Sequence, residues 1–178
     1  PFVLQPGDGV LQAPEIRHRV LEASPGLEVI EIGSPAVHET YADHEMQLST
    51  GRVLPERLFG GQRFVRHIAS EANWLASPIA GCEMRDTGIE VATSGLASVR
   101  VHKATHPATE NGFQRHSGEL LFVFVLNGEL GLVSREEGKQ RIFAGDSCVI
   151  PAGLEFSLQA GVGLELLEVS LPAGALRF

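Results

Sequence analysis

The stretch of sequence from Gly118 to Leu171 reads GELLFVFVLNGELGLVSREEGKQRIFAGDSCVIPAGLEFSLQAGVGLELLEVSL, a chain of short strands separated by turns. Its clearest turn is Asn127-Gly128, the dipeptide favoured in two-residue type I′ hairpins. A second turn is expected at Glu137-Gly138, and the strands that follow are each broken by Gly or Pro. Strands this short and this regularly punctuated predict an all-β sandwich or barrel.

The strand from Leu120 to Leu126 is apolar on both of its alternating faces. A strand with one solvated face alternates apolar and polar side chains, so neither face of this strand is expected to meet water. We expect one face to line the core and the other to be covered by a second sheet or by another subunit.

The end of the chain repeats a piece of its beginning. Residues 7–35 read GDGVLQAPEIRHRVLEASPGLEVIEIGSP, and residues 145–172 read GDSCVIPAGLEFSLQAGVGLELLEVSLP. His18 aligns with Phe156 and, after a one-residue gap, GLEVIEI aligns with GLELLEV. Because an internal repeat reflects a repeated structural unit, we expect residues 1–35 to be the second half of one unit and residues 81–174 to be a complete second unit.

Between the two units, residues 36–80 lack a regular strand pattern. We expect them to form an ordered connector that wraps the complete unit, because a structureless loop of this length is unusual in a compact domain. Two short helices are expected in the connector, around Asp43–Leu48 and around Ile68–Trp74.

Composition and charge limit the partners of this chain. The formal net charge of −8 argues against a nucleic-acid partner, since no basic patch is present to contact phosphates. No apolar run approaches the roughly 20 residues of a membrane span, and no signal peptide is visible. Cys82 and Cys148 are isolated thiols, which suggests a reducing compartment and a cytoplasmic location. The chain starts at Pro1 without Met, so we interpret it as a fragment of a longer protein.

Two motifs bear a family resemblance. Gly145, Pro151, Gly153 and Phe156 follow the spacing G-x5-P-x-G-x2-F, which resembles the second signature of the cupin superfamily with Phe in place of His. The segment HSGELLFVFVLNGEL, which begins at His116, resembles the first cupin signature. The resemblance covers about residues 81–172 and implies a double-stranded β-helix, the jelly-roll barrel of cupins. Together with the repeat, it implies a bicupin-like protein.

The resemblance also implies where a metal would bind. Cupin metal sites use three imidazoles and one carboxylate, a set that suits Fe, Mn, Zn, Ni or Cu. In this sequence the four places hold Gln114, His116, Leu121 and Phe156. Only His116 is a strong ligand, so a divalent transition metal is expected to be absent from this barrel rather than tightly bound. Phe156 and Leu121 would instead line an apolar pocket for a small-molecule ligand.

Other side chains are weaker candidates for metal ligands. Glu119 follows His116 by three residues, and a β-bulge near Gly118 would turn its carboxylate inward; otherwise it is a solvated residue at the start of a strand. His18 takes the place of the last ligand in the N-terminal repeat and would be the remnant of that site. His102 and His106 either reach the mouth of the barrel or lie in a loop.

Three functions remain open from the sequence, and no catalytic residue is identified. In the first, the chain belongs to a bicupin enzyme of the metal-dependent oxygenase or isomerase type, with a degenerate metal site in its C-terminal barrel. Alternatively, it is a non-enzymatic module for small-molecule binding or dimerisation. In the third, His116, Glu119 and Gln114 form a weak metal site.

A half-barrel exposes apolar strand faces and unpaired edges. Val29, Ile30 and Ile32 are the apolar side chains that residues 1–35 would present. We therefore expect this segment to pair with the sheet of the complete barrel, or with a neighbouring chain in a homodimer or a strand-swapped pair.

Overall fold

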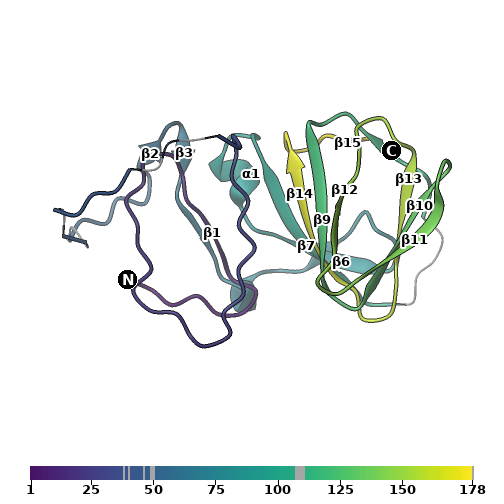
Figure 1. Cartoon of the computed structure of the whole chain (residues 1–178), viewed down its shortest axis with the longest axis horizontal. Coiled ribbons are helices and arrows are strands. Elements are labelled where there is room, and N and C mark those ends of the chain that lie inside the picture. The colour runs from purple at the N-terminus through teal and green to yellow at the C-terminus, as the bar shows by residue number, and fades with distance from the viewer. Residues whose placement is uncertain (38, 40, 46, 49–50, 107–110, 178) are drawn as a thin grey trace.

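The computed structural model describes residues 1–177, except for 38, 40, 46, 49–50 and 107–110. Two parts are visible in Figure 1: a β-barrel at the right and an open N-terminal part at the left, formed mostly of loops. The all-β barrel expected from the turns is confirmed.

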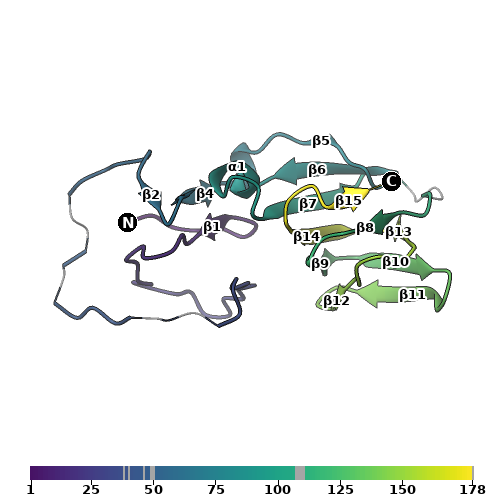
Figure 2. The same cartoon turned by 90° about the horizontal axis from the view of Figure 1, so that it is seen from above.

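Two antiparallel sheets make the barrel, and Figure 2 shows them from above. The larger has six strands in the order β12-β9-β14-β7-β6-β5: β5 (Leu75–Ala76), β6 (Cys82–Asp86), β7 (Ser98–Ala104), β9 (Leu120–Asn127), β12 (Ser147–Val149) and β14 (Glu165–Leu171). The smaller has three, in the order β11-β10-β13: β10 (Glu129–Ser134), β11 (Gly138–Phe143) and β13 (Phe156–Ala160). A short helix α1 (Ile89–Ala92) lies between β6 and β7, and β8 (Arg115–His116) pairs with β15 (Leu176–Arg177).

The expected hairpin between β9 and β10 is present at Asn127-Gly128. Gly128 has φ +70°, and a Cβ at this position would lie 2.5 Å from the carbonyl oxygen of Val162. Only glycine fits both the left-handed backbone and this close approach. The second expected turn ends at Gly138, which also has a positive φ of 76°.

The core lies between the two sheets. One face of β9 contributes Leu121, Val123 and Val125, which pack with buried residues of β10, β13 and β14. The other face of β9 is different, because Phe122 and Phe124 are only half-buried and the neighbouring Val149 is exposed. In the chain alone the outer face of the larger sheet is therefore apolar and partly open, and its expected cover by another subunit stays a prediction.

The N-terminal part contains two small antiparallel pairs. β1 (Gly9–Leu11) pairs with β4 (Val65–His67), and β2 (Leu58–Phe59) pairs with β3 (Gln62–Arg63). We expected the N-terminal segment to pair with the sheet of the barrel or with another chain. Its strand β1 pairs with the connector and not with the sheet of the barrel, and no strand pattern was recognised in the connector. Pairing with another chain stays a prediction.

The connector contains less helix than expected. A single 3-10 turn, η1 (Ala69–Glu71), lies within the second predicted helix. Around the first, residues 43–45 and 47–48 are not helical, and Met46 lies outside the described residues. None of the helices among the described residues is long and apolar enough to cross a membrane. Cys82 and Cys148 are free thiols, and burial raises the pKa of both, which disfavours the reactive thiolate.

The repeat is visible in the backbone, first at the turn that precedes β1 and β12. The N–H of Asp8 donates to the carbonyl of Gln5 at 2.9 Å, and the N–H of Asp146 donates to the carbonyl of Phe143 at 2.9 Å. The two carboxylates then accept the N–H groups of the same residues, from Gln5 at 3.0 Å and from Phe143 at 3.2 Å. The two turns therefore have the same hydrogen bonds.

Two later turns of the repeat also coincide. Glu15 and Gly153 both have a positive φ, of 61° and 79°. The N–H groups of the residues that follow them, Ile16 and Leu154, each donate to the carbonyl three residues back at 3.3 Å. In the third turn Leu27 and Leu164 make the equivalent bonds at 3.2 and 3.4 Å.

The segments between these turns differ. In the barrel they are β13 and β14, whereas the aligned residues 18–22 and 28–34 belong to no strand. Their apolar side chains are exposed, and Val29 is 71% exposed. The N-terminal copy thus has the turns of a half-barrel without its sheets.

Candidate functional site

The cupin ligand places come together at one end of the barrel core. Gln114 and Phe156 are paired through two backbone hydrogen bonds, of 2.8 and 3.0 Å. His116 lies two residues after Gln114, so both side chains are on the face of the chain directed toward Phe156. Leu121 is joined to the same place through Ile150, whose N–H donates to the Leu121 carbonyl at 2.9 Å.

His116 is buried, with 3% of its surface exposed. Its Nε2 lies 2.7 Å from the carbonyl oxygen of Ile150. Because a carbonyl oxygen can only accept, Nε2 carries a proton and donates it, so any lone pair of the ring lies on Nδ1. Nδ1 is buried without a hydrogen-bond partner. The only strong ligand residue of the set therefore has one nitrogen engaged and the other without a partner.

Phe156 and Leu121 fill the space around this imidazole. They are 0% and 1% exposed and belong to the hydrophobic core. The rings of His116 and Phe156 meet edge to face, with centroids 6.4 Å apart and an interplanar angle of 74°. We expected these two apolar side chains to line a ligand pocket, but they present almost no surface that a water molecule could touch. They pack the core instead.

Glu119 does not join this group. Its side chain is exposed, one residue before β9 begins, while Leu121 on the same strand faces the core. Of the two alternatives for Glu119, the inward turn of its carboxylate is therefore absent, and Glu119 is a solvated residue at the start of a strand.

His18 lies in the N-terminal part, away from the barrel. Its ring is exposed, and its Nδ1 contacts the carbonyl oxygen of Ile16 at 3.1 Å. Among the residues that the structure describes, no three His, Cys, Asp or Glu side chains lie where they could share a metal ion. The structure therefore does not bring His18 together with the residues of the barrel.

The donor set of the barrel does not fit a cupin metal. Four protein ligands from imidazole and carboxylate hold Fe, Mn, Ni or Zn in such sites. Phe156 and Leu121 have no lone pairs, and the amide of Gln114 is a weak ligand. His116 Nδ1 is itself buried, so a metal in contact with it would have to enter the packed core.

Sequence reasoning missed a buried polar group formed by residues of β7 and β14, in the larger sheet. His102 pairs with the core residue Leu166 across β7 and β14, so its side chain points inward. Its Nδ1 lies 2.8 Å from Ser77 Oγ, and its Nε2 lies 3.7 Å from a carboxylate oxygen of Glu168. His102 and Glu168 are both buried, and Ser77 Oγ also accepts the N–H of Ile79 at 3.0 Å. The sequence of β7 did not reveal this placement, because its alternation with valines at 99 and 101 would direct the valines, and not His102, toward the core.

This polar group is a buried network rather than an open site. The distance between His102 Nε2 and Glu168 is too long for a hydrogen bond, and Nε2 has no other partner. His106, the other histidine before the motif, is exposed and contacts Thr105 Oγ1 at 2.9 Å. Neither histidine contributes to the group around His116.

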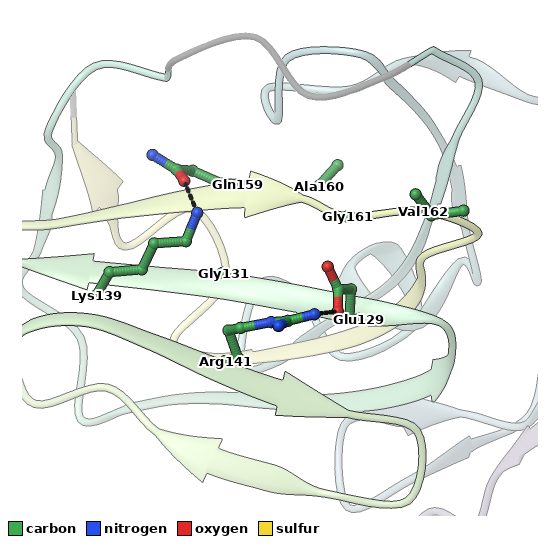
Figure 3. Close-up of a pocket in the computed structure, with 8 residues that line it drawn as sticks. All are labelled: Glu129, Gly131, Lys139, Arg141, Gln159, Ala160, Gly161 and Val162. Carbon is green, nitrogen blue, oxygen red and sulfur yellow. Dashed lines mark hydrogen bonds and ion pairs between the residues drawn. The ribbon is translucent and has the colours of Figure 1, made fainter.

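A surface pocket of about 240 Å³ lies on the outer face of the smaller sheet (Figure 3). Lys139 and Arg141 reach across it, and Gly131 leaves room at its floor. Lys139 Nζ donates to Gln159 Oε1 at 2.9 Å, and Arg141 pairs with the carboxylate of Glu129. The polar groups of this pocket therefore bind one another, as the dashed lines of Figure 3 show: Arg141 is paired with Glu129, and the Lys139 ammonium is hydrogen-bonded to a neutral amide.

Comparison with known proteins identifies the barrel through its fold. No family model matches the chain, and no curated protein matches its sequence. A Thermotoga maritima protein described as a predicted oxalate decarboxylase is 25% identical, over 58% of this chain and 96% of that one, with a TM-score of 0.50. KdgF from Halomonas sp. is 16% identical over 60% of this chain and 93% of its own, with a TM-score of 0.50.

Two further solved structures are similar to the same share of the chain. The polyketide cyclase RemF from Streptomyces resistomycificus is 16% identical over 61% of this chain and 80% of its own, with a TM-score of 0.51. An RmlC-like cupin from Shewanella frigidimarina is 14% identical over 60% of this chain and 89% of its own, with a TM-score of 0.50. Each matches well over half of this chain. The chain therefore carries a cupin barrel, and its resemblance to the cupin superfamily is confirmed.

Proposed function

We propose that this chain is part of a bicupin of the metal-dependent oxygenase or isomerase type, in which the C-terminal barrel is a metal-free scaffold. One observation carries the proposal: the cupin metal position is packed with Phe156 and Leu121, at 0% and 1% exposure, around a His116 whose Nε2 is hydrogen-bonded to Ile150. A packed apolar core stabilises the barrel but leaves no coordination sphere.

The bicupin part of the proposal is supported by the coincident turns of the repeat. In the C-terminal barrel, β14 is held between β9 and β7, and β13 pairs with β10. The aligned residues 28–34 and 18–22 have no such neighbours among the described residues. Strands equivalent to β7, β9 and β10 from another cupin half would pair with them and bury Val29 and Ile32.

The catalytic metal would then belong to that completed N-terminal barrel. His18 aligns with the last ligand of the cupin signature, and its ring is accessible. The 25% identity to the protein described as a predicted oxalate decarboxylase supports an enzyme of this superfamily. The substrate stays open, because one fold serves many reactions.

Metal analysis tests the scaffold assignment. The chain is expressed with Fe, Mn, Ni and Zn in the medium, and the metal content of the purified protein is measured. We expect far less than one metal ion per chain. The matched variant Gln114→His/Leu121→Glu/Phe156→His restores three imidazoles and a carboxylate, and we expect it to retain metal. Stoichiometric metal in the natural chain that is lost on His116→Ala would contradict the proposal.

A second function, dimerisation, is favoured by the exposed apolar residues between 27 and 32. Leu27, Val29, Ile30 and Ile32 are all exposed large hydrophobic residues in one short segment. An unpaired apolar strand is a template for pairing with another chain. In the 178-residue chain by itself, this segment would pair with the same segment of a second copy, giving a homodimer without a catalytic role.

A further inference from the structure

The N-terminal part is attached to the barrel through Arg85. This arginine lies on β6, and its side chain is 3% exposed. Its Nη1 donates to the carbonyl oxygen of Gly7 at 3.1 Å and to Nε2 of His67 at 2.8 Å. Gly7 precedes β1 and His67 ends β4, so one guanidinium holds both strands of the N-terminal sheet.

The contact between Arg85 and His67 fixes the protonation state of the imidazole. A guanidinium has only donors, so Nε2 of His67 must accept, and the ring is neutral with its proton on Nδ1. Both side chains are buried, because His67 is 9% exposed and Arg85 is 3% exposed. A proton added to Nε2 would remove the acceptor and place a second cation 2.8 Å from the first.

The surrounding charges compensate this second cation weakly. Both oxygens of the Asp8 carboxylate already accept backbone N–H groups, from Gln5 and Ala69. Glu165 is 4.0 Å from Arg85, and Asp86 is 3.4 Å from Arg100. Two further charged residues line the pocket beside His67: Arg66, whose guanidinium lies over the Phe2 ring, and Glu71.

We propose that His67 and Arg85 form a proton-operated clasp, which holds the N-terminal strands on the barrel at neutral pH and releases them in acid. Released strands β1 and β4 would uncover the outer side of β6. The proposal does not depend on the function of the C-terminal barrel, because the clasp lies outside the barrel core.

The direction of the pH effect follows from proton linkage. Burial, and then the charge of Arg85, lower the pKa of His67 below its ordinary value of 6.5. The released state therefore binds the proton more tightly than the clasped state. The clasp is fully formed above pH 6.5 and weakens as the pH falls toward the lowered pKa. Because one proton separates the two states, docking weakens by up to about tenfold per pH unit within this window.

Trp74 reports on this contact. It is the only tryptophan of the chain, and the guanidinium of Arg85 lies 5.6 Å from the centroid of its ring. Loss of a cation from this position, together with rearrangement of the strands, would change the fluorescence of the indole.

The test follows Trp74 fluorescence from pH 8 to pH 5, and amide hydrogen exchange of residues 7–11 and 62–67 at both ends, corrected for intrinsic exchange. We expect a transition with its midpoint below 6.5, the ordinary pKa of histidine, and a loss of protection in both peptides. The far-ultraviolet circular dichroism should change by no more than the two short strands β1 and β4 contribute, which shows that the barrel is intact.

Two variants complete the test. His67→Gln keeps an acceptor for Arg85 but does not titrate, so its fluorescence and exchange should stay at the neutral-pH values down to pH 5. His106→Gln alters an exposed histidine and should behave as the natural chain does. A transition that persists in His67→Gln, or no transition in the natural chain, would overturn the proposal.

Discussion

Glu15 and Gly153 hold the same left-handed backbone position in two copies of one turn, with φ of 61° and 79°. A residue with a Cβ rarely adopts this conformation, so Glu15 is held there by the turn that it shares with Gly153. Three residues later the copies differ in chemistry, because His18 stands where Phe156 packs the core. The turns of the repeat are thus the same, while one potential metal ligand is absent from the barrel.

If Phe156 packs the core instead of facing a ligand, truncating it must destabilise the barrel. We expect Phe156→Ala to lower the free energy of unfolding by about 3–5 kcal/mol, measured by urea denaturation. Phe143→Ala, on an exposed side chain of β11, is the control and should change it much less. Equal effects of the two substitutions would show that Phe156 is not packed in the core.

The left-handed backbone conformation of Gly153 predicts that alanine at this position destabilises the barrel. A Cβ at Gly153 would meet no atom within 4 Å, so Gly153→Ala tests conformation alone. We expect it to destabilise the barrel by about 1–2 kcal/mol in thermal or urea unfolding. Gly112 has the same open space without a positive φ, and Gly112→Ala should be neutral or slightly stabilising. The prediction fails if the two alanines have the same effect.

The buried polar network predicts a role for Ser77 in stability. Ser77→Ala leaves both His102 Nδ1 and the N–H of Ile79 without their partner. Unfolding free energy should fall by about 1–3 kcal/mol, because unsatisfied buried groups keep their full desolvation penalty. Ser147→Ala, on an exposed residue of β12, should stay within about 0.5 kcal/mol of the natural chain.

Self-association through residues 27–32 predicts a specific charge effect. In sedimentation velocity experiments over a range of concentrations, we expect a homodimer. Val29→Asp should raise its dissociation constant at least about tenfold, because burying an unpaired charge costs more than the roughly 1.4 kcal/mol that corresponds to a factor of ten. Val162→Asp places the same charge on an exposed residue of the barrel and should leave the dimer unchanged. A natural chain that stays monomeric throughout would contradict this mode of association.

The barrel could be predicted from the sequence because its signals are local. The Asn127-Gly128 hairpin and the Gly and Pro positions after Gly138 specify turns, and turns spaced in this way specify short antiparallel strands. The packing of Phe156 was also within reach, since an apolar residue at an inward position of a barrel fills its core.

The remaining features depend on pairing between distant segments. His102 faces inward because β7 pairs with β14, some sixty residues further along the chain. β1 pairs with β4, whose three residues carry no strand periodicity. The contact between His67 and Arg85 joins a connector to an outer strand face, where a buried arginine was not expected. None of these arrangements has a signal within a single window of sequence.

The most direct test of the metal-free scaffold is the nuclear magnetic resonance of the His116 ring during a titration with Zn²⁺. The account predicts that Nε2 carries a proton and is hydrogen-bonded to Ile150. It also predicts that the ring nitrogen shifts of His116 do not move, while exposed histidines such as His18 and His106 respond weakly. A change in the chemical shift of His116 Nδ1 that is complete at one Zn²⁺ per chain would contradict the account.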